Sequence, residues 1–258
     1  MTAIDRDRMA ARLFLRAVLP VMKILLTEDA KMASRFAEAN FRISFHAPDE
    51  RGPVGACVKL DHGAFSIAFA PCEDAEIVFR FSSLAKMNAF FAGKPVVPAI
   101  RGWWRLGLLI KAVSLLMGLK ILMPTADPKD AGRRRLKVKM TFYMITTALS
   151  QYNKGEDPEM AQWTARQPER IYQITVDEDI AAYLRVKAGK TKAGRGVYGR
   201  RKPFVHMCFS GVEGAYPIVM NQVNMVDAVR DGLLRIDGSP EYARDMGDFM
   251  MRIQELIT

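Results

Sequence analysis

The first of two related stretches reads Phe81-Ser-Ser-Leu84-Ala-Lys-Met87-Asn-Ala-Phe90-Phe-Ala-Gly93 and is followed by Ile100-Arg-Gly102. Its counterpart reads Met220-Asn-Gln-Val223-Asn-Met-Val226-Asp-Ala-Val229-Arg-Asp-Gly232 and is followed by Ile236-Asp-Gly238. In both copies an extended apolar run leads into a helix with regularly spaced apolar residues, and a glycine ends that helix. The repetition predicts two related units in one chain, with no conspicuous catalytic residue in either.

Helices and strands are predicted around the first copy. Residues 5–39 read as helix, with apolar side chains on one stripe and a kink expected at Pro20. Extended segments are predicted near 41–47, 54–60, 64–70 and 75–81, and apolar residues alternate in the last two, which predicts strands with one buried face. The connections between these strands are short, which favours mostly antiparallel pairing. A helix over 83–92, a Gly/Pro-rich connection over 93–102 and a very apolar helix over 103–122 complete this half.

The second half begins after a cluster of Pro, Asp, Lys and Gly residues at 124–132. Helices are predicted over 133–153 and near 157–166, then strands at 170–176, 181–187, 203–209 and 215–221, then helices at 222–231 and 239–256. The sequence therefore predicts an α+β fold of two tandem units, each a mostly antiparallel sheet covered by helices. The expected division is a helical segment 1–40, a first unit 41–123, a helical linker 124–168 and a second unit 169–258.

Composition narrows the class of protein. Half of the 258 residues are apolar, so the chain can bury a core, and a disordered chain is excluded. The formal net charge of +10 favours acidic partners such as lipid headgroups, phosphorylated or carboxylated ligands, or nucleic acid. The sixteen methionines suit either an adaptable ligand pocket or ordinary core packing.

The cysteines and the N-terminus bear on location. Cys57, Cys72 and Cys208 have no C-x-x-C spacing and lie in or beside apolar strand-like runs, which predicts buried, reduced thiols. Asp5 and Asp7 do not suit the basic start of a signal peptide. We therefore expect a cytoplasmic protein, with peripheral membrane association left open.

The repeated pattern resembles the sterol carrier protein type-two family of lipid-binding domains. The matching segments in the first copy are Phe65–Phe69, Ala75–Phe81, Leu84 to Gly93 and Ile100–Gly102. Those in the second copy are Phe204–Phe209, Val223 to Gly232 and Ile236–Gly238. The resemblance implies, for each copy, a five-stranded sheet whose helices enclose an apolar tunnel for lipids, sterols or acyl chains.

We accordingly expect non-catalytic binding or transfer of a hydrophobic or amphipathic ligand, a lipid above all, with no cofactor and no metal. The ligand's tail would lie against apolar side chains of the sheet and helices, at about 25 cal/mol for each Å² removed from water. The side chains expected to line the site are Phe69, Phe79, Phe81, Phe90, Trp103, Trp104, Leu108, Leu109, Leu116, Met117, Met207, Phe209, Met220, Met225 and Phe249.

The apolar segment 103–122 supports a rival function. Lys111 near its middle costs about 2.5–3.5 kcal/mol in a bilayer, against about 0.3–0.6 gained for each Leu or Ile. The segment could span a membrane, dock on one as an amphipathic helix, or be buried against a lipid pocket or the other unit, and burial is favoured. Docking of this helix on a membrane or on a partner subunit would make the protein a structural or interaction module. A further alternative is an accessory subunit of a lipid-acting enzyme.

Two basic clusters, 133–139 and 187–202, have two interpretations. Either they are solvated, with 187–202 a mobile hairpin loop, or they attract an anionic membrane or a ligand's charged head. They match no groove-reading motif and carry no aromatic platform beyond Tyr198, so nucleic acid is not expected as a partner. A homodimer is left open.

The three histidines are His46, His62 and His206. None has a cysteine or carboxylate at a recognisable metal-ligand spacing, and the sequence has no nucleophile-elbow or dinucleotide-binding motif. A third alternative is an enzyme that acts on a lipidic substrate with His206 or His62 as the base.

Overall fold

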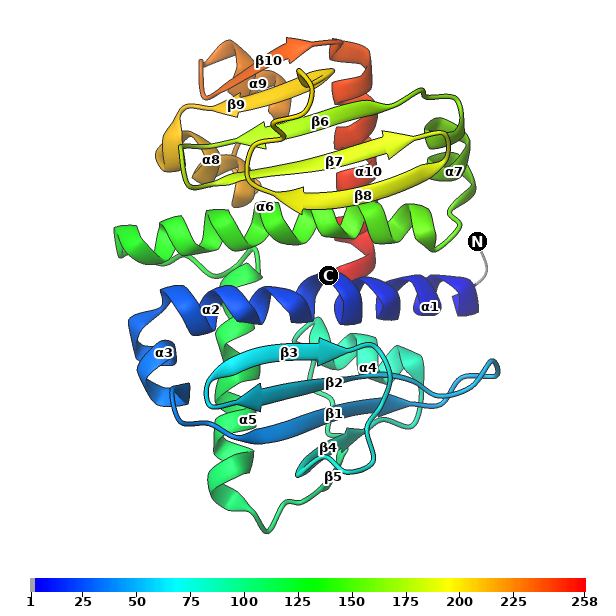
Figure 1. The fold of residues 1–258 in the computed structure, drawn as a ribbon, viewed down its shortest axis with the longest axis vertical. Helices are drawn as coiled ribbons and strands as arrows, with labels where there is room; N and C mark the ends of the chain where they lie inside the picture. The colour runs from blue at the N-terminus through cyan, green and yellow to red at the C-terminus, as the bar shows by residue number, and fades with distance from the viewer. Residues whose placement is uncertain (1–2) are drawn as a thin grey trace. The chain divides into compact units, whose positions relative to one another are not determined.

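The computed structural model describes residues 3–258, so the first two residues of the expected segment 1–40 lie outside it. The chain forms two compact units, residues 3–120 together with Leu256–Thr258, and Ile121–Glu255. Each contains one five-stranded sheet with helices packed on it (Figure 1). The predicted α+β class with two tandem units is confirmed.

The two sheets have the same topology. The strands of the first unit are β1 (Phe41–Ala47), β2 (Val54–Asp61), β3 (Ala64–Ala68), β4 (Ile77–Arg80) and β5 (Ala99–Arg101), in the order β3-β2-β1-β4-β5. Those of the second are β6 (Arg170–Thr175), β7 (Ala181–Lys187), β8 (Lys190–Arg195), β9 (Val205–Phe209) and β10 (Leu234–Gly238), in the order β10-β9-β6-β7-β8. Reversed, the second order is β8-β7-β6-β9-β10, in which each strand takes the place of its counterpart in β3-β2-β1-β4-β5. The central pairs β1–β4 and β6–β9 are parallel, and the other pairs are antiparallel.

The predicted helix over 5–39 is divided into shorter helices. It comprises α1 (Ala3–Leu13), a π-helical turn Phe14–Val18, a 3₁₀ turn Leu19–Val21, α2 (Met22–Glu28) and α3 (Ala30–Phe36). Pro20 lies in the 3₁₀ turn, where its missing N–H is tolerated. Asp29 is extended, and its carboxylate accepts a hydrogen bond from the N–H of Met32, which ends α2 and begins α3.

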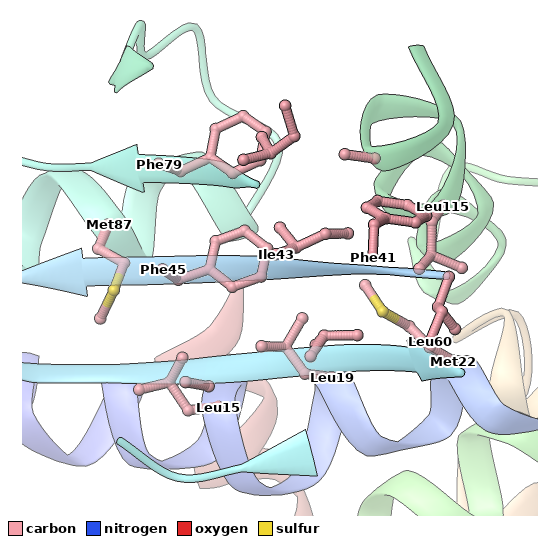
Figure 2. Close-up of a cluster of buried hydrophobic side chains, with 14 of the residues drawn as sticks. Leu15, Leu19, Met22, Phe41, Ile43, Phe45, Leu60, Phe79, Met87 and Leu115 are labelled. Carbon is pink, nitrogen blue, oxygen red and sulfur yellow. The ribbon is translucent and has the colours of Figure 1, made fainter. Parts of the chain in front are cut away.

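The core of the first unit lies on the helix-covered face of its sheet. Phe41, Ile43 and Phe45 alternate along β1 and are almost completely buried (Figure 2). Leu19 from the N-terminal helices and Leu115 from α5 (Leu106–Gly118) belong to the same cluster. The N-terminal segment is therefore part of the first unit and not a separate domain. Helix α4 (Leu84–Phe91) and a 3₁₀ turn (Leu119–Leu122) complete this set of helices.

The segment expected as a linker belongs to the second unit. Helix α6 (Ala131–Lys154) packs on β7 and β8, and α7 (Pro158–Ala165) also contacts both strands. Asp130 and Asp157 cap the two helices by accepting hydrogen bonds from backbone N–H groups. The division at Lys120 precedes the boundary predicted from loop composition at 124–132, and the helices after that loop carry apolar faces that the second sheet buries.

Two predictions in the second half are wrong. The expected strand 215–221 is largely helix α8 (Gly211–Val219), because packing on α6 buries Ala215 and Tyr216. The Tyr216 hydroxyl also donates a hydrogen bond to Asp127 Oδ1 at 2.8 Å. The expected loop 187–202 contains strand β8, and a side chain at its Gly194 would lie about 2.1 Å from the Tyr183 ring. Helices α9 (Met225–Arg230) and α10 (Pro240–Ile257) agree with prediction.

A disulfide joins Cys57 and Cys72. Cys57 lies in β2 and Cys72 in the connection from β3 to β4, which turns back along the sheet and brings the two Cα atoms to 5.6 Å. The expectation of reduced thiols is therefore wrong for this pair, and only Cys208 is free. Disulfides are typical of oxidising compartments. The cysteines therefore no longer support the cytoplasmic location, which stays a prediction.

Candidate functional site

Helix α5 exposes an apolar stripe. The side chains of Leu106, Ile110, Val113 and Met117 are spaced three and four residues apart and lie on one face. Their exposed fractions are 63%, 59%, 42% and 51%. We call these four residues the α5 stripe. Exposed residues of this size and type rarely gather on a surface that only water contacts.

The opposite face of α5 packs on the first sheet. Ala112 and Leu115 are fully buried in the core cluster, and Leu108, Leu109 and Leu116 pack against it. Helix α5 runs across the sheet behind the strands in Figure 1. The favoured prediction of a buried helix is therefore right for one face only. Of the part of the chain that the structure describes, no helix is both long and apolar enough to cross a membrane.

Two tryptophans precede the helix. Trp103 and Trp104 are 63% and 62% exposed, and their rings meet edge to face with centroids 6.3 Å apart. Gly102 makes this placement possible, because a positive φ of 88° turns the chain sharply after β5. Exposed indoles at the end of an apolar helix face are typical of residues that enter the headgroup region of a bilayer.

The charged residues in the sequence segment that contains the α5 stripe are all basic. From residue 77 to residue 126 the sequence contains no aspartate or glutamate, but seven lysines and arginines. Arg105 and Lys120 at the two ends of α5 are exposed, and Lys111 is half-buried at the edge of the stripe. Long basic side chains at the edge of an apolar face can reach an anionic surface while their stems lie on apolar groups. The apolar helix is a prediction from the sequence pattern, whereas the absence of acidic residues around it was not recognised there.

The predicted lining residues of the first unit fall into two groups. Phe79 and Phe81 are buried, and Phe90 packs against both with ring centroids 6.1 and 5.2 Å apart. These rings contact one another, so they form core and do not line an open surface. Phe69 is 41% exposed beyond the end of β3, with the Arg16 guanidinium 4.6 Å from its ring centroid.

The predicted lining residues of the second unit are mostly core. Met207 and Phe209 of β9 and Phe249 of α10 are buried. Phe249 meets the indole of Trp163 with centroids 5.5 Å apart. Met220 and Met225 are half-buried at the ends of helices α8 and α9. These expected residues therefore lie in the core or at helix ends, and Phe249 packs on residues outside the predicted set.

The histidines lie in three different settings. His62 is exposed in the turn between β2 and β3 with a positive φ of 46°, and His46 is half-buried on β1. His206 is half-buried on β9, and its Nε2 lies 2.8 Å from Thr175 Oγ1. Burial lowers the pKa of His206, and the nearby Asp237 carboxylate opposes this shift only in part. The imidazole is therefore neutral at pH 7 and able to accept a proton or a metal ion.

Comparisons with known proteins do not identify a family. No family model matches the chain, and no curated protein matches it. Among solved structures, the sec-alkylsulfatase Pisa1 from Pseudomonas sp. aligns with a TM-score of 0.25 and 13% identity over 55% of this chain. A double mutant of PisA1 aligns with a TM-score of 0.28 and 13% identity over 56% of the chain. In both cases the alignment spans 28% of the sulfatase, and similarity this low supports no inference about function.

Proposed function

We propose that the protein is a non-catalytic lipid-binding protein that docks on anionic membranes through the α5 stripe. The observation that carries the proposal is the stripe itself, an exposed apolar helix face with two exposed tryptophans at its start. A helix that is apolar on both faces needs a second apolar environment besides the core it already contacts. The acid-free segment 77–126 favours an anionic lipid surface as that environment.

The resemblance to sterol carrier proteins adds a cargo to this proposal. An acyl chain or sterol would lie on the helix-covered face of a five-stranded sheet, beside residues such as Phe79, Phe81 and Phe90. Because these rings pack against one another, a ligand would have to displace them to enter. Native mass spectrometry of gently purified protein tests this part. Recovered lipid supports a carrier, whereas an empty protein that still binds vesicles has a docking role alone.

Replacing one residue of the stripe tests the docking. Ile110→Asp places a charge at the centre of the exposed face and removes an apolar contribution of about 1.5–3 kcal/mol, so vesicle binding should weaken by about tenfold or more. The measurement is co-sedimentation with vesicles of phosphatidylcholine containing phosphatidylglycerol. Binding of the unaltered protein should fall at high salt and on phosphatidylcholine alone, because the basic side chains contribute through a screened attraction.

The matched control is Val226→Asp, which introduces the same charge at an apolar position that is 80% exposed in the second unit. It should leave vesicle binding unchanged. The emission of Trp103 and Trp104 should shift to shorter wavelength on binding. The docking proposal is wrong if the unaltered protein fails to bind anionic vesicles, or if both aspartate variants bind as it does. A dimer that Ile110→Asp dissociates, without vesicle binding, would identify a second copy as the occupant instead.

A further inference from the structure

A cluster of polar side chains lies on the face of the second sheet opposite its core. His206 and Cys208 are two residues apart on β9, so their side chains project from the same face. Antiparallel pairing with β10 places Asp237 opposite His206 and Arg235 opposite Cys208. The potential ligand atoms of His206, Cys208 and Asp237 all lie within 4.8 Å of one another.

We propose that His206, Cys208 and Asp237 form a zinc-binding site. An imidazole nitrogen, a thiolate sulfur and a carboxylate oxygen are the three ligand types that zinc uses in proteins. Bonds to zinc of about 2.0–2.3 Å require the ligand atoms to come about 3.5 Å apart. Small rotations of side chains that are not fully buried achieve this from the observed separation. Three protein ligands leave a fourth position for water or an anionic group. This site does not depend on the proposed membrane docking.

The surroundings orient the histidine in the way a metal ligand requires. Metal-binding histidines generally hold their second ring nitrogen in a hydrogen bond to a neighbouring group. Here His206 Nε2 lies 2.8 Å from the hydroxyl of Thr175 on the adjacent strand β6. When Nε2 carries the proton and donates it to Thr175, Nδ1 has the free lone pair. Cys208 is the free cysteine of the described chain, so its sulfur is available.

Arg235 gives the site a built-in competitor. A guanidinium nitrogen of Arg235 lies 3.1 Å from Asp237 Oδ2 and 3.8 Å from Cys208 Sγ. It therefore contacts two of the three atoms that would bind the metal. The Arg235 side chain is 73% exposed, so it can swing into solvent when zinc takes its place. Removing this cation should strengthen zinc binding, whereas removing a ligand should weaken it.

Zinc titration of the full chain against a chromophoric chelator tests the proposal. The protein is first stripped of metal and kept without added thiol under inert gas, so that the Cys57–Cys72 disulfide stays closed. We expect one zinc ion per chain. Cys208→Ser, His206→Gln and Asp237→Asn should each weaken binding by about tenfold or more. Arg235→Gln should tighten it severalfold, and His62→Gln in the exposed turn is the matched control that should not change it.

Cobalt substitution gives a second readout that reports the ligand itself. With Co²⁺ the unaltered protein should show a thiolate-to-metal charge-transfer band, and Cys208→Ser should lose it while its circular dichroism stays the same. The proposal is overturned if the unaltered chain binds no zinc stoichiometrically. It is equally overturned if Cys208→Ser binds zinc as tightly as His62→Gln does, or if the thiolate band is absent.

Discussion

Gly102 and Gly238 occupy equivalent positions in the two units and have the same two constraints. Each has a positive φ, of 88° and 108°. A Cβ atom at either position would lie 2.0 Å from a backbone carbonyl oxygen, that of Glu76 or that of Phe204. The carbonyl precedes the neighbouring strand, β4 or β9, so the close approach comes from the sheet pairing itself. Only glycine satisfies both constraints, which explains why the second turn of the sequence repeat ends in glycine in both copies.

Alanine at either position should destabilise the protein. We expect Gly102→Ala and Gly238→Ala to lower the free energy of unfolding by about 2 kcal/mol or more, from backbone strain and the carbonyl clash together. Urea denaturation measures the loss. Gly107→Ala in α5 is the control, because nothing lies within 4 Å of its added Cβ. A helical position of this kind should be neutral or gain up to about 1 kcal/mol. Equal effects at positions 102 and 107 would contradict the explanation.

Asp177 is a residue whose charge contributes to stability. Burial alone would raise the pKa of its carboxyl, but hydrogen bonds from Arg135 and from the N–H groups of Ile180 and Asp179 outweigh this and lower the pKa. The distances from Asp177 Oδ1 to the backbone nitrogens of Ile180 and Asp179 are 2.8 and 3.0 Å. The carboxylate therefore fixes the turn that leads into β7 and ties it to helix α6.

The sign of the pH effect follows from the lowered pKa. A carboxyl with a lower pKa in the folded than in the unfolded state stabilises the protein above its unfolded pKa, and this stabilisation is lost as the pH falls through the folded value. Asp177→Asn should therefore lower the free energy of unfolding at pH 7 by about 1 kcal/mol. The difference from the unaltered protein should shrink between pH 5 and pH 3. Asp231→Asn, at a surface ion pair with Arg230, should have a smaller effect. A difference that is constant with pH would argue against this role.

At the scale of elements, the disulfide holds β2 to the connection between β3 and β4. It closes a loop of 15 residues. Constraining the unfolded chain over such a loop contributes about 3 kcal/mol. Replacing Cys57 and Cys72 together by alanine should lower stability to urea by about this amount, and reducing agent should do the same to the unaltered protein. Cys208→Ala, measured with chelator present, should leave the stability to urea unchanged, because that thiol closes no loop. Identical denaturation curves with and without reducing agent would show that the bridge does not stabilise the fold.

The elements that could be predicted from the sequence are those with strong local signals. The alternation in β3 and β4 and the apolar face of α6 could be recognised, because burying one face imposes a regular pattern. The apolar run of α5 and the capping residues before α10 were equally local signals. Helix α8 was missed because its aromatic and β-branched residues favour a strand, and its packing on α6 overrides that preference. Strand β8 was missed because its two lysines and its glycine resemble a loop. Such an edge strand needs the neighbouring β7 to define it.

At the scale of the whole molecule, two copies of one topology carry different surfaces. The first unit has the α5 stripe and the segment without acidic residues, whereas the second has the polar cluster around His206 on its sheet. Neither feature is shared between the copies. At the sheet edge where β10 carries Arg235 and Asp237 at exposed positions, its counterpart β5 carries Ala99, Ile100 and Arg101. The duplication therefore preserves the scaffold while each copy presents its own surface.

The amino-acid sequence by itself determined the duplication, the α+β class and the apolar character of α5, because each of these depends on patterns within a few turns or strands. It did not determine which apolar residues are core and which are exposed, since several predicted lining residues pack against one another and the α5 stripe faces outward. Nor did it bring Cys57 to Cys72, or His206 and Cys208 to Asp237. These residues meet only because the sheet pairs strands that are distant in sequence, and tertiary structure alone fixes that pairing.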